Sequence, residues 1–575
     1  MTASAPERGR RRKPEDAGSA PGPWVLPLGF FSLFFAACEA YGPALNGPFV
    51  FDDQYLPFLG GGFTHWSHWL NGNRPMASLT FWFNYEWSRF DTFSYHLVNL
   101  LFHAANSLLL YLIVRRFLAL REVKAELRET VAGFCGALFL LHPVQTEAVS
   151  YIVSRSENLS ALFFYGALAV FLYRGKQPVG WRRSACIVVL LACAASSKEH
   201  AVTLPALLLL TDYFWNPGFT AEGMKRNWRL YFALALAAGA AVPYTLRIFR
   251  YADSAGFGST SVHWYQYLFT QGRVIFVYLR LFVAPFGQTI DYDFPISKTI
   301  LDQGAFIGLA GILAIIGAAF AFKRRYPLAS YGALAFLLLL APTSSVMPIE
   351  DPIAERRMYL PFIGLLLVAA EALLSVTVPV RKLVWPLCAV LVACAFLTYQ
   401  RNQLWASSEA LWKDAVAKSP GKQRAHFQLA YVYYEQQRCG DALREFESAA
   451  RIKEPDYRLL FDWALAHDCA GEAGEAVAKL LRAIALNRTA HAYSQLGMLY
   501  AKQNRRAEAL DAWAAGEKLT PGFEWTYFYR GNLYALEKNY PAAIAEYSKT
   551  IAINPRNQEA RSARAAAQGL VRETP

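Results

Sequence analysis

Long apolar runs dominate the first 400 residues of the chain, and an amphipathic pattern with helical spacing replaces them afterwards. About 20 apolar residues cross the hydrocarbon core of a bilayer as a helix, and charges at the centre of such a helix are costly. By this rule the sequence predicts about eleven membrane helices, at residues 24–41, 93–114, 130–146, 158–173, 184–197, 200–214, 229–246, 304–322, 327–345, 358–378 and 384–400. The apolar stretch 266–284 is expected to lie in the interface or to re-enter the membrane.

The part after residue 400 fits a period of about 34 residues, in which small and large side chains recur where two helices cross, as in tetratricopeptide repeats. The clear copies carry Leu429, Ala430, Tyr433, Ala442, Phe446 and Ala449; Leu496, Gly497, Tyr500, Ala509, Trp513 and Gly516; and Gly531, Tyr534, Ala543 and Tyr547. A half repeat with Trp412 and Ala415 precedes them, so the last membrane helix is expected to run directly into the array. The pattern predicts an α-solenoid that binds an extended peptide or serves as a spacer without a ligand.

Charge and composition agree with this division. Hydrophobic residues make up 54% of the chain and charged residues only 18%. Lys and Arg near membrane helices stay on the cytoplasmic side, and the basic clusters fall on one side if residues 247–303 form one long external loop. We predict a disordered, basic cytoplasmic tail at 1–23, a transmembrane domain at 24–400 and an extracytoplasmic repeat domain at 401–575. The net charge of +13 largely reflects this bias, and we expect no nucleic-acid binding.

Two of the eight cysteines lie away from the apolar runs. The repeat register places Cys439 in the turn of one repeat and Cys469 near the end of the first helix of the next, and these regions adjoin in a stacked array. We hypothesise a disulfide between them, which suits an oxidising compartment. Two unpaired buried thiols are the alternative.

Two adjacent carboxylates, Asp52 and Asp53, follow the first apolar run in an aromatic and weakly polar segment. Such a setting just above a bilayer raises the pKa of a carboxyl, which could then accept a proton from a hydroxyl. The alternative is a helix N-cap or a structural loop pair.

Further polar and charged residues gather in the segments that the topology places outside. They are Arg74, His96, Glu147, Arg155, Lys198, Glu199, Glu355 and Arg356. Arg155 and Lys198 suit contacts with a phosphate, because arginine can bind it with two donors and lysine as a point charge. Pairing of each with a neighbouring glutamate is the alternative. His96 lies on the polar face of a predicted membrane helix and is either a cavity residue or a satisfied packing residue.

Carboxylates for proton removal beside cations for phosphate suggest attack of an acceptor hydroxyl on a phosphate-activated group carried by a lipid. Glycosyl transfer from a polyprenyl-phosphate sugar is such a reaction. The same residues suit a proton-coupled transporter, so the residues alone leave both classes open. Adjacent acidic residues could hold Mg or Mn, but the reaction requires no metal and the histidines show no metal-ligand spacing.

The motifs and their order resemble the transmembrane and tetratricopeptide-repeat (TMTC) protein O-mannosyltransferases. The matching residues cover most of the chain: Phe51-Asp52-Asp53, Arg74-Pro75, Asn84-Tyr85, Tyr95-His96, Leu141-His142-Pro143, Thr146-Glu147, Ser154-Arg155, Ser197-Lys198-Glu199, Ala354-Glu355-Arg356 and Arg401-Asn402. The resemblance implies an all-α fold, a polytopic GT-C-type membrane bundle with an outward-facing active site followed by the repeat solenoid. It also implies a dolichyl- or polyprenyl-phosphate mannose donor and Ser or Thr acceptors.

Carried over to this chain, the resemblance makes Asp53, or else Asp52, the catalytic base. It makes these residues candidates for donor or phosphate binding: Arg155, Lys198, Glu147, Glu199, Arg74, His96, Glu355 and Arg356. We expect an inverting transferase that moves a hexose from the lipid-linked donor to exported proteins, with the array docking the acceptor polypeptide and a divalent metal as a possible cofactor. Transfer to a glycan or lipid, a transporter and an assembly scaffold are the alternatives. The short array and compact loops predict a bacterial inner-membrane homologue that uses undecaprenyl phosphate.

Overall fold

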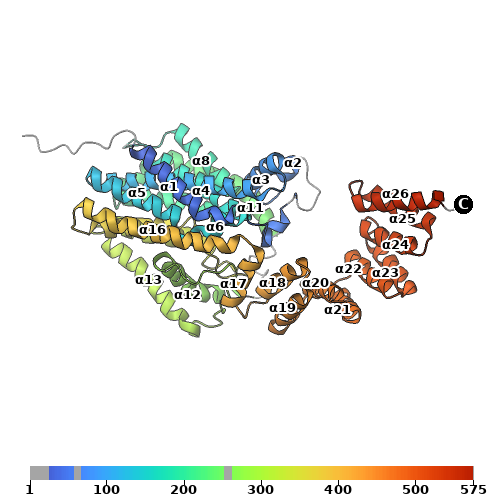
Figure 1. The fold of residues 1–575 in the computed structure, drawn as a ribbon. Helices are drawn as coiled ribbons and strands as arrows, with labels where there is room; N and C mark the ends of the chain where they lie inside the picture. The colour runs from blue at the N-terminus through green and yellow to red at the C-terminus, as the bar shows by residue number, and fades with distance from the viewer. Residues whose placement is uncertain are drawn as a thin grey trace, which may run out of the picture.

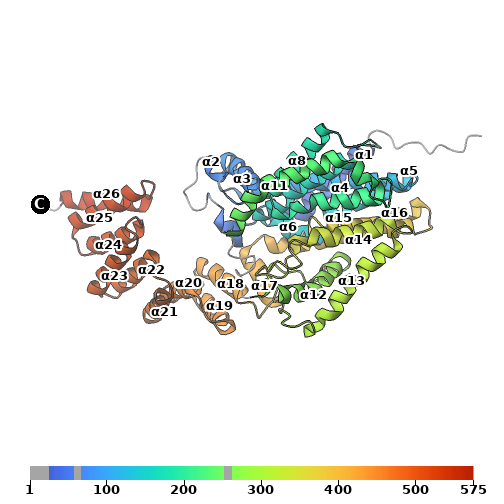
Figure 2. The same cartoon turned by 180° about the vertical axis from the view of Figure 1, so that it is seen from behind.

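The helices of the chain form a bundle and, at one end of it, a curved array (Figures 1 and 2). The computed structural model describes residues 25–56, 58, 66–70, 72–175, 177–250 and 262–573, and over these residues it is all-α, as predicted. The predicted tail at 1–23 lies outside the described residues.

Each predicted apolar run falls on a helix of the bundle. These helices are α1 (Val25–Tyr41), α4 (Thr92–Leu120), α5 (Ala125–Leu141), α7 (Arg155–Leu172), α8 (Trp181–Ala195), α9 (Leu204–Trp215), α11 (Trp228–Arg250), α13 (Ala305–Phe322), α14 (Pro327–Leu340), α15 (Phe362–Leu374) and α16 (Val380–Trp405). Within the described residues, three helical segments are long and apolar enough to cross a membrane: Thr92–Leu120, Asp302–Phe322 and Val380–Trp405. The larger number of about eleven spans, which follows from apolar length alone, is not confirmed.

The stretch 266–284 forms most of one continuous helix, α12 (Trp264–Val283), which packs along α13. Elsewhere in the bundle, α14 and α15 cross with their backbones in contact. A Cβ atom on Gly332 would lie 2.4 Å from the carbonyl oxygen of Gly364, so only glycine fits at this crossing. Small residues are the usual means by which apolar helices approach this closely.

Short elements connect the bundle helices and carry most of the predicted site residues. They are η1 (Gly42–Ala44), η2 (Phe51–Tyr55), α2 (Trp66–Trp69), α3 (Pro75–Ser88), η3 (Pro143–Gln145), α6 (Thr146–Ser150), η4 (Ile152–Ser154), η5 (Glu199–Thr203), α10 (Glu222–Arg226), η6 (Asp302–Gly304) and η7 (Glu355–Met358). Elements α2, α3 and α6 lie toward the end of the bundle from which the array continues (Figure 1). The predicted site residues therefore lie near the junction with the array.

The array consists of antiparallel helix pairs. They are α18 (Gln423–Glu435) with α19 (Cys439–Ile452), α20 (Tyr457–Cys469) with α21 (Ala473–Leu486), α22 (Ala490–Lys502) with α23 (Arg506–Leu519), and α24 (Glu524–Leu536) with α25 (Tyr540–Ile553), between α17 (Ser408–Lys418) and α26 (Gln558–Glu573). Template residues such as Ala442, Phe446 and Trp513 are fully buried. The tetratricopeptide prediction is thus confirmed, and α16 leads into the half repeat α17 after only two residues.

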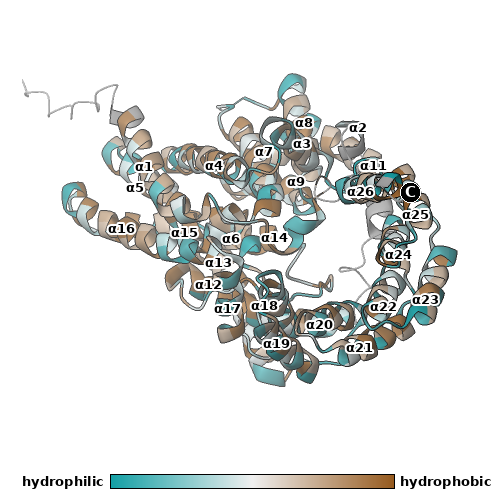
Figure 3. Ribbon diagram, turned by 45° about the vertical axis from the view of Figure 1, so that its right-hand side comes forward, coloured by the Kyte–Doolittle hydropathy of each residue, from teal (hydrophilic) through white to brown (hydrophobic). Residues whose placement is uncertain are grey.

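The array curves into an arc whose inner side is formed by α20, α22 and α24, with α21 and α23 outside (Figure 3). The open side of the arc faces the end of the bundle near α2 and α3 in Figures 1 and 2. A polypeptide on the inner side would therefore lie close to the connecting elements of the bundle.

The predicted disulfide is confirmed. Cys439 at the start of α19 is bonded to Cys469 at the end of α20, with 5.7 Å between their Cα atoms. The bond joins two consecutive repeats and closes a loop with a sequence separation of 30 residues. A covalent link of this length restricts the unfolded chain and stabilises the array.

We expect reduction of this disulfide to lower the unfolding free energy of the array by about 3 kcal/mol, because the reduced unfolded chain gains conformational freedom. Thermal unfolding with and without reductant measures the effect. The Cys439→Ser/Cys469→Ser variant is the control and should not respond to reductant. Equal melting temperatures of the wild type in both conditions, with both thiols open to alkylation, would contradict the prediction.

Candidate active site

The predicted acidic pair lies on η2, within a segment that we call the acid loop, residues 50–55. Asp53 is fully buried. Its Oδ2 accepts a hydrogen bond from the Val50 N–H at 3.1 Å, and its Oδ1 accepts one from the Val153 N–H at 2.7 Å. Burial raises the pKa of the Asp53 carboxyl to about 8, and these backbone donors oppose the rise only in part. The carboxyl therefore ties the acid loop to η4 and holds its proton at neutral pH.

Asp52 differs from its neighbour because its side chain is only half-buried. The Asp52 N–H donates to the Tyr151 hydroxyl at 2.8 Å. On its other side Phe51 adopts a positive φ of 51° and stacks on Tyr151, with 6.2 Å between the ring centroids. Packing on Tyr151 thus fixes the backbone that presents the Asp52 carboxylate.

Three cations, Arg74, Lys198 and Arg356, come together from distant segments, and we call them the cation cluster. They lie within electrostatic range of one another, and their side chains are 37%, 16% and 22% exposed. The cluster adjoins the acid loop, because the Arg356 guanidinium lies 6.0 Å from the centroid of the Tyr151 ring.

A glutamate neutralises each member of the cluster. Arg74 pairs with Glu199 at 3.0 and 3.2 Å. The Lys198 Nζ lies 3.0 Å from Oε1 of the buried Glu157. Both the backbone N–H and the guanidinium of Arg356 donate to Glu147, the former at 3.0 Å. The glutamates orient the cations and leave part of each exposed.

Arg155 lies apart from the cation cluster. Its side chain is fully buried and donates to Asn99 Oδ1 at 2.8 Å, Asn84 Oδ1 at 2.6 Å, the Thr80 carbonyl at 3.2 Å and the Tyr95 carbonyl at 3.0 Å. It thereby joins α3, α4 and α7. The structure gives no support to the prediction that Arg155 contacts a lipid phosphate, because the protein itself occupies its donors.

His96 is also buried, with its Nε2 at 3.3 Å from the Gly47 carbonyl oxygen. It lines a cavity of about 10 Å³, close to the space that one water molecule needs. A Cβ on Gly47 would lie 2.4 Å from the Trp405 carbonyl oxygen, so glycine is required where this segment crosses the end of α16. His96 therefore lines a small internal cavity, and its Nδ1 is buried without a hydrogen-bond partner among the described residues, so packing does not fully satisfy the ring.

Glu355 is buried and holds a segment of the long loop after α12. It accepts hydrogen bonds from Gln288 Nε2 at 2.7 Å, the Thr289 N–H at 2.9 Å and the Tyr292 hydroxyl at 2.6 Å. Burial raises the pKa of its carboxyl to about 7. Glu355 thus positions residues 288–292 next to Arg356, and a bound donor could not reach it in this arrangement.

Two residues that complete the site were not among the predicted ones. Glu157 pairs with both Lys198 and His200, whose Nδ1 lies at 3.3 Å. The sequence shows Glu157 as an acidic residue in a charged segment, but it does not show that Lys198 and His200 are its partners. Tyr151 links the acid loop to Arg356, and no sequence feature separates it from the many other aromatic residues. Among the described residues, no group of three or more His, Cys, Asp or Glu could hold a metal ion.

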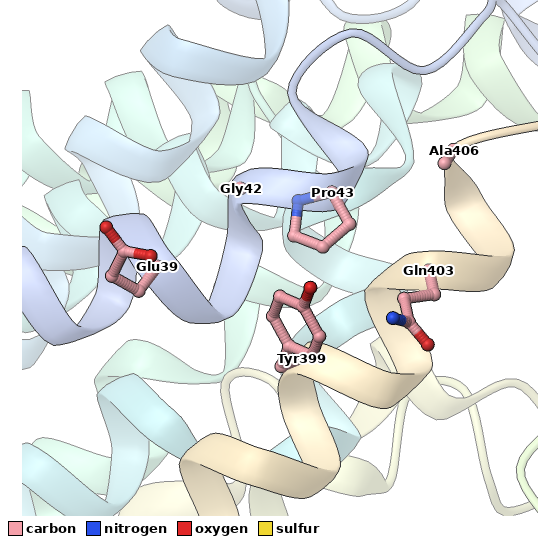
Figure 4. A pocket seen from close by; sticks show the side chains of 6 residues that line it. All are labelled: Glu39, Gly42, Pro43, Tyr399, Gln403 and Ala406. Carbon is pink, nitrogen blue, oxygen red and sulfur yellow. The ribbon is translucent and has the colours of Figure 1, made fainter.

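Another hollow lies away from these residues. It has a volume of about 580 Å³ and lies between the end of α1, η1 and the last turns of α16 (Figure 4). It is lined by Glu39, Gly42, Pro43, Tyr399, Gln403 and Ala406. None of the predicted site residues contributes to it.

The pKa of Asp53 predicts a pH dependence of stability. Because the folded pKa of about 8 lies above the usual 3.8, Asp53 stabilises the folded state fully below about pH 4, and this contribution is lost as the pH rises to about 8. Melting temperatures in detergent should therefore fall more steeply between pH 5 and 8 for the wild type than for Asp53→Asn, which cannot ionise. Parallel curves would contradict the raised pKa.

Comparison with known proteins finds no matching family model. The chain is 24% identical over 544 residues to "Protein O-mannosyl-transferase TMTC3" of Mus musculus, covering 84% of this chain and 57% of that protein. It is 23% identical over 475 residues to "Protein O-mannosyl-transferase F38B6.6" of Caenorhabditis elegans, covering 78% and 65%. The chain thus spans less than two thirds of the length of these relatives.

Among solved structures, YrrB, "a TPR protein with an unusual peptide-binding site", aligns with 31% of this chain and 89% of its own at 24% identity and a TM-score of 0.24, too low a similarity to support a conclusion. The sequence relatives are more informative, because they match both the bundle and the array over most of this chain. They support the resemblance that the motifs indicate: the chain is similar to the TMTC protein O-mannosyltransferases over most of its length.

Proposed function

We propose that the chain is a multi-pass membrane glycosyltransferase of the GT-C type. It would move a hexose, mannose by analogy with its relatives, from a polyprenyl-phosphate sugar to Ser or Thr hydroxyls of exported proteins. The observation that carries the proposal is the contact, through Tyr151, of the acid loop with the cation cluster. In this proposal the acid loop supplies the proton acceptor, and the neighbouring cation cluster supplies the groups that bind the phosphate.

Asp52 is the catalytic base in this proposal, and Asp53 positions it. A general base must come within hydrogen-bond distance of the acceptor hydroxyl. The half-buried Asp52 side chain can do so, whereas Asp53 is enclosed and both of its oxygens accept backbone hydrogen bonds. This assignment reverses the order of preference that the sequence suggested.

The reaction is a single displacement. The acceptor oxygen forms a bond to the anomeric carbon as the bond from that carbon to the lipid phosphate breaks, and the hydroxyl proton passes to Asp52. The configuration at the anomeric carbon is inverted. The lipid phosphate leaves as an anion, which Arg74, Lys198 and Arg356 would stabilise as its charge develops.

The site would face the extracytoplasmic side, with the N-terminus in the cytoplasm and the array at 401–575 outside. The disulfide Cys439–Cys469 supports this orientation, because such bonds persist in oxidising compartments. The array would then dock the acceptor polypeptide beside the site. The relatives named above are animal proteins, so a bacterial inner membrane and undecaprenyl phosphate stay predictions.

Replacement of the base tests the proposal. With labelled polyprenyl-phosphate mannose and exported proteins as acceptors, Asp52→Asn should lower transfer by about 100-fold or more, because general bases contribute about 10²–10⁴-fold. Its melting temperature should match that of the wild type. Asp511→Asn, an exposed carboxylate on α23, is the matched control.

Transfer by Asp52→Asn at the wild-type rate would rule out Asp52 as the base. A folded wild-type chain that transfers no hexose from any polyprenyl-phosphate donor would contradict the proposed function. Accumulation of a substrate in vesicles without consumption of donor would then indicate a transporter.

A further inference from the structure

Arg424, on the first full repeat of the array, contacts three separate segments of the bundle. Its Nε donates to Asp291 Oδ2 at 2.8 Å, and its Nη2 donates to Asp291 Oδ1 at 2.6 Å and to Asp351 Oδ2 at 2.8 Å. Its guanidinium also lies 4.9 Å from the centroid of the Phe51 ring. One side chain of the array thus joins the acid loop to the loops around residues 291 and 351.

Each of these segments leads directly to the candidate active site. Phe51 immediately precedes Asp52. Asp291 lies within the segment 288–292, whose other residues donate three hydrogen bonds to Glu355. Asp351 and Glu355 belong to one segment, which ends at Arg356 of the cation cluster. Arg424 therefore contacts one residue next to Asp52 and two segments that are linked to Arg356. Its contacts can influence both the acid loop and the cation cluster.

The contacts of Arg424 form a largely buried ionic network. The Asp291 side chain is only 2% exposed, and Lys422 lies 3.4 Å from it and 3.0 Å from Asp351. Burial alone would raise the pKa of Asp351, but Arg424 and Lys422 hold it well below its usual range. Removal of Arg424 leaves the buried Asp291 with the longer, 3.4 Å contact to Lys422 in place of two short hydrogen bonds, so the loops should rearrange.

A second set of contacts reaches the acid loop from the array. Arg458, on α20, donates from Nη1 to the Tyr55 hydroxyl at 2.7 Å. Trp412, on α17, packs edge-on against Phe51 with 5.8 Å between the ring centroids. The positive φ of Phe51 is unfavourable for a residue with a side chain and persists only where packing holds it. The array supplies that packing at both ends of the loop.

We propose that Arg424 is a positioning residue and that the first repeats of the array hold the acid loop in its reactive geometry. This proposal rests on the proposed function and deepens it. The array then serves the chemical step, in addition to any docking of the acceptor. A dock would affect only acceptors large enough to bind the array, whereas a positioning element affects every acceptor alike.

The test compares two acceptors in the full chain. One is an exported protein, and the other is N-acetylserine amide, which is too small to reach from the array to the site. Arg424→Ala should lower kcat with both by a similar factor, about 100-fold, because small displacements of catalytic groups have effects of that size. KM for the protein acceptor should change little. Arg424→Lys keeps the positive charge but cannot donate two parallel hydrogen bonds to the Asp291 carboxylate, so it should recover part of the rate.

Arg451→Ala is the matched control. Arg451 is an exposed arginine on α19 that pairs with Glu447, one turn away, and contacts no bundle residue in the part of the chain that the structure describes, so its replacement should leave both rates unchanged. Tyr55→Phe is a second variant that leaves the ionic network intact. It removes the hydroxyl that accepts from Arg458, and a fall of about 3-fold with both acceptors is expected. An Arg424→Ala rate that falls only with the protein acceptor would overturn the positioning role.

Amide hydrogen exchange separates failure of this proposal from failure of the proposed function. Arg424→Ala should speed exchange at the Asp53 and Val153 N–H groups while α22 to α25 keep wild-type protection, whether or not sugar is transferred. If Arg424→Ala disturbs the array, Tyr55→Phe takes its place in the same measurement. Unchanged exchange in the acid loop would overturn the proposal, and absence of transfer by the wild type with both acceptors would overturn only the proposed function.

Discussion

A continuous apolar cluster joins the bundle to the array, and the rest of the structure depends on it. Val50, Tyr151 and Trp405 of the bundle pack in one cluster with Trp412 and Phe427 of the array. Burial of apolar area at this junction fixes the direction in which the array leaves the bundle. The same side chains enclose the acid loop, so the position of the array and the geometry of the candidate base have one physical origin.

Charge is arranged around this junction in two ways. On the bundle side, Arg74, Lys198 and Arg356 are each neutralised by a glutamate and remain partly exposed, which suits a site whose ligand brings its own negative charge. On the array side, Arg424 is committed to two carboxylates and an aromatic ring. The Arg424 side chain is 28% exposed, within the range of those three cations, so it differs from them in the number of bundle segments that it joins rather than in burial.

Local regularity explains what the sequence could predict. The apolar runs, the tetratricopeptide register and the pairing of Cys439 with Cys469 follow from spacing along the chain, and the structure agrees with all three. The number of membrane spans could not be settled in this way. Several bundle helices, such as the 14-residue α14, are too short to cross a bilayer by length alone.

The partners of charged residues could not be predicted, because they come from segments far apart in the chain. Arg155 looks like a phosphate ligand in the sequence, yet burial among Asn84 and Asn99 occupies its donors. No signal in the sequence marks Arg424, which meets Asp291 across 133 positions. The aromatic, weakly polar segment around Asp52 and Asp53 marks the pair in the sequence. Only the difference in burial between the two side chains assigns a separate role to each.

The central claim is that the acid loop and the cation cluster form one site for a lipid-linked sugar phosphate. A structure of the chain with a non-hydrolysable polyprenyl-phosphonate mannose tests it most directly. We predict the phosphonate within hydrogen-bond distance of at least one of Arg74, Lys198 and Arg356, and the anomeric carbon facing Asp52. A ligand bound instead in the hollow beside Glu39 and Tyr399, or on the array alone, would contradict the account.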